Sequence, residues 1–183
     1  MDLREVTEFF KDTFKYIIVI VVAIVVFLYV VSFQQIVGNS MSPILKDGDV
    51  AVLSKIGVKI GKIKRNQIVA LKTNDGKLYV KRVVGLPGEE VHYLNGVLYI
   101  DGVGYKESYL KEDVVTRNFM FVDICDEKDC PEGIIPEDMY LVLGDNRGDS
   151  LDSRDPSLGL VKKDNIVGKS LFKIWPLSEI GKT

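Results

Sequence analysis

The chain has 183 residues, enough for one good-sized domain and short for two. Its 24 basic and 26 acidic side chains leave a formal net charge of −2, so no charge excess points to a nucleic-acid partner. No internal repeat or low-complexity tract is visible, and the apolar residues are spread unevenly.

The apolar excess is concentrated near the N-terminus. Residues 16–31 read YIIVIVVAIVVFLYVV, without a charge, a glycine or a proline. A helix through them spans roughly 24 Å, and Phe14, Ser32 and Phe33 extend it toward a ~30 Å hydrocarbon core. Because the run has no polar face, a membrane anchor is favoured over a buried core helix or core strand. A cleavable signal peptide is disfavoured because the run is long and no small-x-small site follows it.

This anchor divides the chain into three parts. We expect residues 1–15 to be a short cytoplasmic segment, residues 16–33 a single-pass transmembrane anchor, and residues 34–183 an extracytoplasmic domain. Counting lysines and arginines does not favour this orientation, because more of them follow the anchor than precede it. Long domains are translocated largely regardless of their charge, so the chemistry of the domain decides the orientation.

The chain beyond the anchor is typical of an antiparallel β-protein. Apolar runs of strand length lie at 50–53, 68–71, 78–84, 139–143 and 166–175. Asn95–Gly96 is the strongest hairpin signal in the chain. No long amphipathic helix follows the anchor, so we expect a mainly β fold, an N-terminal transmembrane helix followed by an antiparallel sheet or barrel-like domain. The mixed, charged residues from about 104 to 138 are expected to form a peripheral excursion.

The two cysteines, Cys125 and Cys130, lie within that excursion. A metal site would need more ligands, and His92, the single histidine, is far away in the sequence. We therefore predict no metal and no cofactor. A disulfide would suit an extracytoplasmic domain, and two free thiols are the alternative.

Two residues beyond the anchor are candidates for nucleophilic catalysis. Ser40 lies in the polar turn at 38–43, and Lys81 lies in an apolar strand-type segment. A lysine acts as a base near neutral pH only if its surroundings remove its proton, which an apolar strand can do. A serine–histidine–aspartate triad is not expected, because His92 lies on a predicted hairpin strand and should face solvent.

A third segment, residues 144–154, is unusually polar for its position between two apolar segments. Its sequence, GDNRGDSLDSR, combines carboxylates, hydroxyls, an amide and two arginines. A plain acidic loop seldom mixes so many donors and acceptors. The composition predicts a polar network that holds other groups in place.

Together the three segments resemble those of bacterial type I signal peptidases, which are membrane-bound serine–lysine proteases. SMSP at 40–43 is similar to the family's nucleophile box, and KRVVGLPGE at 81–89 is similar to its lysine box. Residues 144–154 are similar to its third box. The order of the boxes and their position after an N-terminal anchor also fit, and the resemblance spans about residues 35–175.

The resemblance implies a role for each matching residue. Ser40 Oγ would attack the scissile carbonyl, and neutral Lys81 would be the general base and later the acid toward the leaving amine. Ser150 would orient the lysine amine, and the Ser40 backbone N–H would donate to the oxyanion. A supporting shell of salt bridges would be formed by Asp145, Arg82, Asp152 and Arg154.

Two positions depart from the family pattern. Gly38 stands where some members carry a serine whose hydroxyl completes the oxyanion hole, so the second donor is not identified. Ile44 stands where the family usually has a threonine, which should change local hydrogen bonding without removing the nucleophile. In the glycine and the compact length, the chain is similar to enzymes of Gram-positive or similar single-membrane bacteria.

The resemblance also implies the partners. These would be secretory preproteins with small-x-small cleavage sites and the lipid bilayer of a bacterial cell membrane, with no nucleic acid. The preprotein would pair with exposed strand edges near Ser40 and Lys81, because alternate side chains of a strand face the same way. Its small side chains would enter shallow pockets, and core packing is the alternative role for the residues expected to line them, Ile36, Met41, Tyr79 and Val80.

Two other functions are compatible with parts of the sequence. A LexA-like self-cleaving domain also uses serine and lysine, but such proteins carry a DNA-binding helical head where this chain has an anchor. A non-catalytic, membrane-tethered β module could bind secretory partners. The joint presence of Ser40, Lys81 and Ser150 argues against that second alternative.

Overall fold

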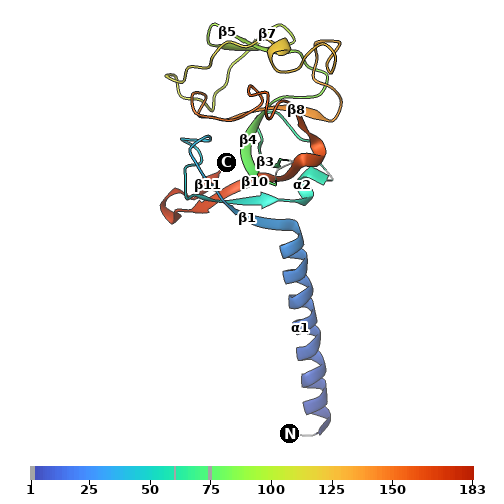
Figure 1. Cartoon of the computed structure of the whole chain (residues 1–183). Coiled ribbons are helices and arrows are strands. Elements are labelled where there is room, and N and C mark those ends of the chain that lie inside the picture. Colours follow the sequence, from blue (N-terminus) through green and yellow to red (C-terminus); the bar gives the residue numbers. More distant parts are fainter. Residues whose placement is uncertain (1–2, 60, 74–75) are drawn as a thin grey trace.

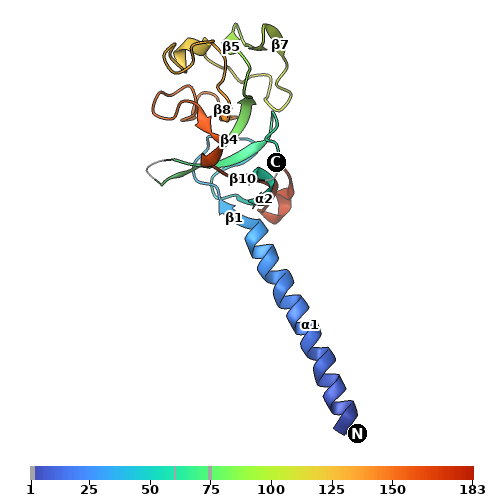
Figure 2. The same ribbon diagram turned by 90° about the vertical axis from the view of Figure 1, so that its right-hand side faces the viewer.

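The computed structural model describes residues 3–59, 61–73 and 76–183. One long N-terminal helix leads into a domain built from two antiparallel sheets (Figures 1 and 2). The mainly β fold expected from the strand-length apolar runs is confirmed. The short helices are α2 (Ile56–Lys59) and the 3-10 turns η1 (Phe121–Asp123), η2 (Lys163–Asn165) and η3 (Leu177–Glu179).

Helix α1 (Leu3–Val30) projects away from the sheets into open space (Figure 1). Its segment Lys11–Val30 is 20 residues long, and it is the only stretch in the described part of the chain that is apolar and long enough to cross a membrane. At ~1.5 Å per residue it matches a ~30 Å hydrocarbon core. None of this segment is buried against the domain, which excludes the alternative of a buried core helix.

The helix ends earlier than the sequence predicted. We expected the anchor to run to Phe33, but the helix stops at Val30 and strand β1 (Val31–Gln35) follows directly. Val31 pairs with Ser54, and the Lys55 N–H donates to the Val30 carbonyl at 2.9 Å. Pairing with a neighbouring strand therefore captures the β-branched and aromatic residues at 31–33 before the helix can continue.

The large sheet has the strand order β1-β2-β10-β3-β4-β8-β9, and β11 pairs with β10. Its remaining strands are β2 (Val50–Ser54), β3 (Ile68–Lys72), β4 (Leu78–Gly85), β8 (Met139–Leu143), β9 (Val161–Lys162), β10 (Ile166–Trp175) and β11 (Gly181–Lys182). All of its pairings are antiparallel. Strand β4 pairs with β3 from Leu78 to Arg82, whereas its pairing with β8 begins only at Arg82. One edge of β4 before Arg82 thus carries no described strand.

The small sheet consists of β5 (Val91–Leu94), β6 (Val97–Ile100) and β7 (Val103–Tyr105). Its first turn is the predicted hairpin, with Asn95 and Gly96 at φ of 52° and 81°, the left-handed region that such tight turns require. The expected excursion begins after β7, one or two residues later than predicted. It is largely irregular, and Cys125 and Cys130 within it form a disulfide.

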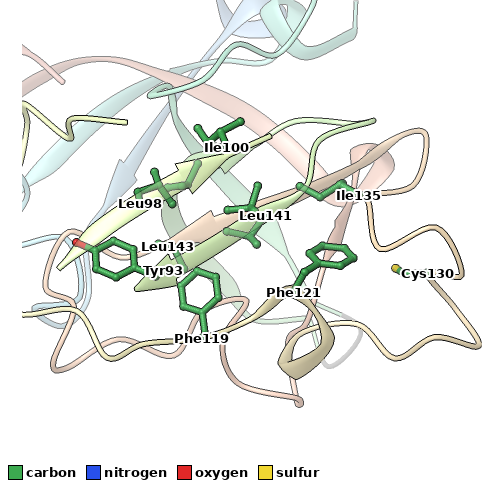
Figure 3. Close-up of a cluster of buried hydrophobic side chains, with 11 residues drawn as sticks. Tyr93, Leu98, Ile100, Phe119, Phe121, Cys130, Ile135, Leu141 and Leu143 are labelled. Carbon is green, nitrogen blue, oxygen red and sulfur yellow. The ribbon is translucent and has the colours of Figure 1, made fainter. Parts of the chain in front are cut away.

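A shared hydrophobic core joins the small sheet to the large one (Figure 3). Leu141 and Leu143 of β8 pack in one cluster with Tyr93 and Leu98 of the small sheet. The excursion closes this cluster with Phe119, Phe121 and Ile135. A fully buried side chain of this size contributes roughly 1.5–3 kcal/mol, so neither the small sheet nor the excursion is loosely attached.

Candidate active site

Ser40 lies in the connection between β1 and β2, and buried apolar neighbours hold this connection in place. Met41 and Leu45 are almost fully buried, at 1% and 0% exposure, in a cluster with Ile36 of the same connection. The Leu45 N–H donates to the Met41 carbonyl at 3.0 Å, and the Ile36 N–H donates to the Asp49 carbonyl at 2.8 Å. The apolar neighbours therefore fix the turn while the Ser40 side chain stays partly accessible.

Lys81 lies in β4, and the fold brings it to the serine. Its Nζ is 2.6 Å from Ser40 Oγ, across a separation of 41 residues in the sequence. The lysine is only 1% exposed, one of the largest fully buried side chains in the chain. The ring of Tyr79, two residues earlier on the same strand, has its centroid 5.8 Å from Nζ.

Burial lowers the pKa of Lys81 from 10.5 to about 8. The negative charge of Asp152 opposes this shift, the positive charge of Arg154 reinforces it, and Asp145 and Asp149 oppose it. With such a pKa, about one amine in ten is neutral at pH 7. Burial in β4 therefore favours the neutral amine, as expected from the sequence of an apolar strand.

Two ion pairs flank the lysine and restrain the carboxylates that oppose its deprotonation. Arg82 binds Asp145 through two parallel hydrogen bonds of 2.8 and 2.6 Å, with both side chains buried. Arg154 binds Asp152 in the same way, at 2.8 and 2.7 Å. Burial raises the pKa of Asp152, but the hydrogen bonds from Arg154 outweigh this and leave the pKa below its usual value. Each carboxylate is therefore matched by an arginine through two hydrogen bonds.

The third segment also holds the serine turn directly. The Asn146 N–H donates to the Ser40 carbonyl at 3.0 Å, and its side-chain amide donates to the Asn39 carbonyl at 3.2 Å. Gly144 makes this close approach possible. A Cβ at Gly144 would lie 2.5 Å from the Ser40 carbonyl oxygen and 2.1 Å from Ser150 Oγ, closer than real Cβ contacts.

Ser150 departs from the expected arrangement. We expected its hydroxyl to hydrogen-bond the Lys81 amine, but Lys81 is bonded to Ser40 instead. Ser150 Oγ is buried, and its hydroxyl lies near the Asp152 carboxylate, whose pKa it helps to lower. It nevertheless lies against Gly144, beside the Ser40 carbonyl, and so borders the site.

The two candidate oxyanion donors differ. Gly38 has φ of +82°, in the left-handed region that favours glycine, and its N–H donates to Asp47 Oδ1 at 2.7 Å. It is therefore not free to bind an oxyanion. The Ser40 N–H makes no hydrogen bond to any other described residue, so it can donate to a substrate.

The four residues expected to line substrate pockets do not gather in one place. Ile36 and Met41 are 4% and 1% exposed, and Val80 packs against their cluster. Tyr79, adjacent on the strand, packs against a different cluster on the opposite face of β4. Ile36 and Met41 are buried in this cluster and Val80 borders them at the partly open surface, so a role in lining the pockets stays a prediction.

His92 takes no part in the site. It lies on β5 in the small sheet and stacks on Tyr99 of β6, with ring centroids 5.0 Å apart. We expected it to face solvent, but its side chain is only 18% exposed, because the cross-strand tyrosine covers it. In the described ranges, no group of histidine, cysteine, aspartate or glutamate side chains is arranged to hold a metal ion.

One further set of polar residues beside the site was not predicted from the sequence. Arg147 is buried and pairs with Glu107, and Tyr109 covers the guanidinium of Arg82. Glu107 and Tyr109 belong to the excursion that we expected to be peripheral. Nothing in their local pattern marks them, because their partners lie about 27 to 40 residues away in the chain.

Comparison with known proteins identifies the family. A family model described as "Signal peptidase, peptidase S26" matches residues 7–175. The chain belongs to this family. The chain is thus an endopeptidase that removes signal peptides, with an apolar N-terminal helix that fits membrane anchoring. The match favours this function over both a LexA-like domain and a non-catalytic module.

Individual relatives agree with the family model. Signal peptidase IB of Staphylococcus aureus is 39% identical over 180 residues, covering 92% of this chain and 93% of the relative. Signal peptidase I of Bacillus caldolyticus is 36% identical over 159 residues, covering 83% and 84%. The crystal structure of a signal peptidase I from Enterococcus faecalis is 36% identical with a TM-score of 0.51, covering 60% of this chain and 97% of that one.

Proposed function

We propose that Ser40 is the nucleophile and Lys81 the general base with which this enzyme cleaves signal peptides from secreted preproteins. The observation that carries the proposal is the 2.6 Å approach of Nζ to Oγ by an amine that is 1% exposed. Burial lowers the pKa of Lys81 to about 8, so the amine can accept a proton near neutral pH.

In the acylation step, the neutral Lys81 amine accepts the hydroxyl proton while Ser40 Oγ forms a bond to the scissile carbonyl carbon. The resulting oxyanion accepts a hydrogen bond from the Ser40 N–H. The C–N bond then breaks, and the Lys81 ammonium donates its proton to the departing amine of the mature protein. The products of this step are a free mature chain and a signal peptide esterified to Ser40.

In the deacylation step, Lys81 is neutral again and accepts a proton from water. The water oxygen forms a bond to the ester carbonyl, and the Ser40 C–O bond breaks as the ammonium returns the proton to Oγ. The signal peptide leaves with a free carboxyl group. One amine thus serves as base and acid in both halves of the reaction, without a histidine.

We assign the flanking residues supporting roles. Arg82 and Arg154 keep the charges of Asp145 and Asp152 matched, so that these carboxylates do not restore the proton of the lysine. Ser150 is proposed to orient the amine during turnover. Its buried hydroxyl lies near the Asp152 carboxylate in the structure and would turn to the amine when the amine moves off Ser40.

The substrate is proposed to add a strand to β4. The edge of β4 before Arg82 pairs with no described strand, and it leads directly to Lys81. An extended peptide there would satisfy the free backbone groups and present alternate side chains to the same face. Small side chains fit best, because Val80 and the buried Ile36 and Met41 leave little depth on that face. This supports cleavage after small-x-small sequences.

The domain is proposed to lie on the extracytoplasmic side of the bacterial cell membrane, with α1 as a single pass. Strands β1, β10 and β11 lie on the side of the domain from which α1 emerges (Figures 1 and 2). Exposed apolar side chains are carried by β1, β10 and the turn after it, namely Phe33, Phe172, Trp175 and Leu177. They suit contact with lipid, and the Cys125–Cys130 disulfide suits an oxidising compartment.

The test uses the full chain in detergent with a fluorescent preprotein that carries a small-x-small site. Ser40→Ala and Lys81→Ala should each abolish cleavage, and His92→Ala should match the wild type. A serine-acylating β-lactam-type inhibitor should add its mass to the wild type and not to Ser40→Ala. Cleavage by Ser40→Ala, or its loss in His92→Ala with Lys81→Ala still active, would show that the assignment is wrong.

A further inference from the structure

We propose that Glu107 and Tyr109 are positioning residues for the reaction, acting through Arg147 and Arg82. Neither touches the proposed nucleophile or base, and both come from the segment that follows the small sheet. The inference rests on the assignment of Ser40 and Lys81 above. It gives the excursion a part in catalysis, where the sequence suggested a peripheral one.

Arg147 is the first link between the excursion and the site. Its guanidinium is fully buried and forms two hydrogen bonds with the Glu107 carboxylate, which is itself 5% exposed. A third bond runs to Thr116 Oγ1 at 2.9 Å, and Nε donates to the Gly144 carbonyl at 3.0 Å. Because a buried charge needs a matched partner, Glu107 balances the charge of Arg147 and holds its guanidinium pointed at Gly144.

Tyr109 is the second link. The centroid of its ring lies 4.2 Å from Arg82 Cζ, so the ring covers this guanidinium. Arg82 binds Asp145 and follows Lys81 in the chain. The Tyr109 hydroxyl donates to Glu107 at 2.5 Å. Burial, together with the Glu107 carboxylate, raises the pKa of Tyr109 well above its usual range, so the hydroxyl remains a donor throughout the working pH. Glu107 thus connects both arginines.

The first link ends at Gly144, and the second reaches the next residue, Asp145, through Arg82. The Gly144 carbonyl accepts from Arg147, and its N–H donates to Asp152 Oδ2 at 2.9 Å. Gly144 also packs so closely against the Ser40 carbonyl and the Ser150 hydroxyl that a Cβ would collide with both. A shift of this peptide would therefore move the serine turn, the proposed orienting serine and the partner of Arg154 together.

The consequence for the reaction is a loss of alignment, with substrate binding left in place. Without the Glu107 charge, Arg147 is a buried, unmatched cation that must rotate toward water and release Gly144. Without the Tyr109 ring, the Arg82–Asp145 pair loses the surface that keeps solvent off one face. A misplacement of ~1 Å in a reacting group can cost roughly 100-fold in rate. The β4 edge proposed for the substrate is untouched by either change.

The test removes the charge of Glu107 and the ring of Tyr109, and compares the effects with those of similar changes at the small sheet. Glu107→Gln and Tyr109→Leu should lower kcat by roughly 10- to 100-fold with KM within about twofold of the wild type. Tyr109→Phe, which keeps the ring, should recover most of the loss. The controls are Glu90→Gln, beside His92, and Tyr99→Leu, which removes the ring stacked on His92; both should keep wild-type kcat.

A double-mutant cycle tests whether Glu107 acts through Arg147. Because the two residues are expected to work as one unit, Glu107→Gln in an Arg147→Gln background should reduce kcat no further. All assays run at least 15 °C below the melting temperature of the least stable variant. If a variant loses activity because part of the enzyme is unfolded, titration with the acylating inhibitor should count fewer active sites. If it loses activity through misalignment, kcat per titrated site should fall.

The outcomes separate this inference from the assignment on which it rests. If the wild type cleaves and Ser40→Ala does not, but Glu107→Gln keeps wild-type kcat per titrated site, only the positioning role is wrong. Multiplicative losses in the double variant, or equal losses in Glu90→Gln and Tyr99→Leu, overturn it as well. If the Ser40→Ala variant still cleaves the preprotein, the assignment of Ser40 as the nucleophile is itself wrong.

Discussion

Replacing Arg154 by methionine should move the pH dependence of cleavage without removing activity. Arg154 acts on Lys81 in two ways: its charge lowers the pKa of the amine, and its two hydrogen bonds match the charge of Asp152. Asp152 is the largest of the charges that raise the pKa of Lys81. Without Arg154, the charge of Asp152 is no longer matched and raises the pKa of Lys81 more strongly, and the positive charge that lowered this pKa is gone. The pKa of Lys81 must therefore rise.

The magnitude follows from the position of the pKa. A lysine with its ordinary pKa of 10.5 has about one neutral amine in 3,000 at pH 7, whereas a pKa of about 8 leaves about one in ten. The site thus gains roughly 300-fold in usable base. Each unit of increase in Arg154→Met, equivalent to ~1.4 kcal/mol, lowers the neutral fraction at pH 7 by about tenfold.

The assay is kcat/KM for a preprotein peptide without groups that titrate near neutrality, measured from pH 6 to pH 10.5 in detergent. This ratio reports the pKa of the free enzyme. The wild type should rise about tenfold per pH unit below pH 8 and level above it. Arg154→Met should rise along a parallel line at higher pH and approach the same plateau. Arg154→Lys keeps a positive charge, so its profile should lie between the two.

Two results would refute this reasoning. A wild-type rate that is flat from pH 8 down to pH 6 would mean that no amine with this pKa is the base. An Arg154→Met profile that falls equally at every pH, with an unchanged midpoint, would mean that Arg154 only holds the structure.

Further outcomes follow from other parts of the site. Lys81→Met should raise the free energy of unfolding at pH 7 by about 3 kcal/mol, measured by urea denaturation, while abolishing cleavage. Because the folded-state pKa is lowered, the cost of the buried ammonium is fully present below pH 8 and disappears as the pH rises to 10.5, so the gain should shrink over that window. Gly144→Ala should lower kcat by roughly 100-fold or more, since its Cβ would displace the serine turn; wild-type kcat would contradict the packing seen here. Replacing Cys125 and Cys130 by serine should lower stability by about 2 kcal/mol, seen as a lower melting temperature, because the loop is short. It should leave kcat unchanged, because Cys130 packs in the cluster of the small sheet and the neighbours of Ser40 pack in another; a loss of kcat would contradict that separation.

Composition and local pattern were sufficient for the class of the protein. The apolar run at 16–31 has no polar face, so it predicts a membrane helix without knowledge of the fold. Strand-length runs and the Asn95–Gly96 turn are local signals, and the β fold and that hairpin followed from them. The boxes around Ser40 and Lys81 and the polar run at 144–154 are contiguous, so the family resemblance could be found in the sequence. Helix α1 was nonetheless predicted to end three residues late, because pairing between β1 and β2 ends it.

Everything that depends on distance between segments was decided by the tertiary structure. The approach of Lys81 to Ser40 and its low pKa come from burial in β4, and burial has no local signature in the chain. That the lysine amine bonds to Ser40 and not to Ser150 could not be foreseen, for the same reason. Glu107 and Tyr109 look like ordinary residues of a charged excursion. They reach the site only because a shared hydrophobic core packs the small sheet against β8, which brings their segment over Arg147 and Arg82.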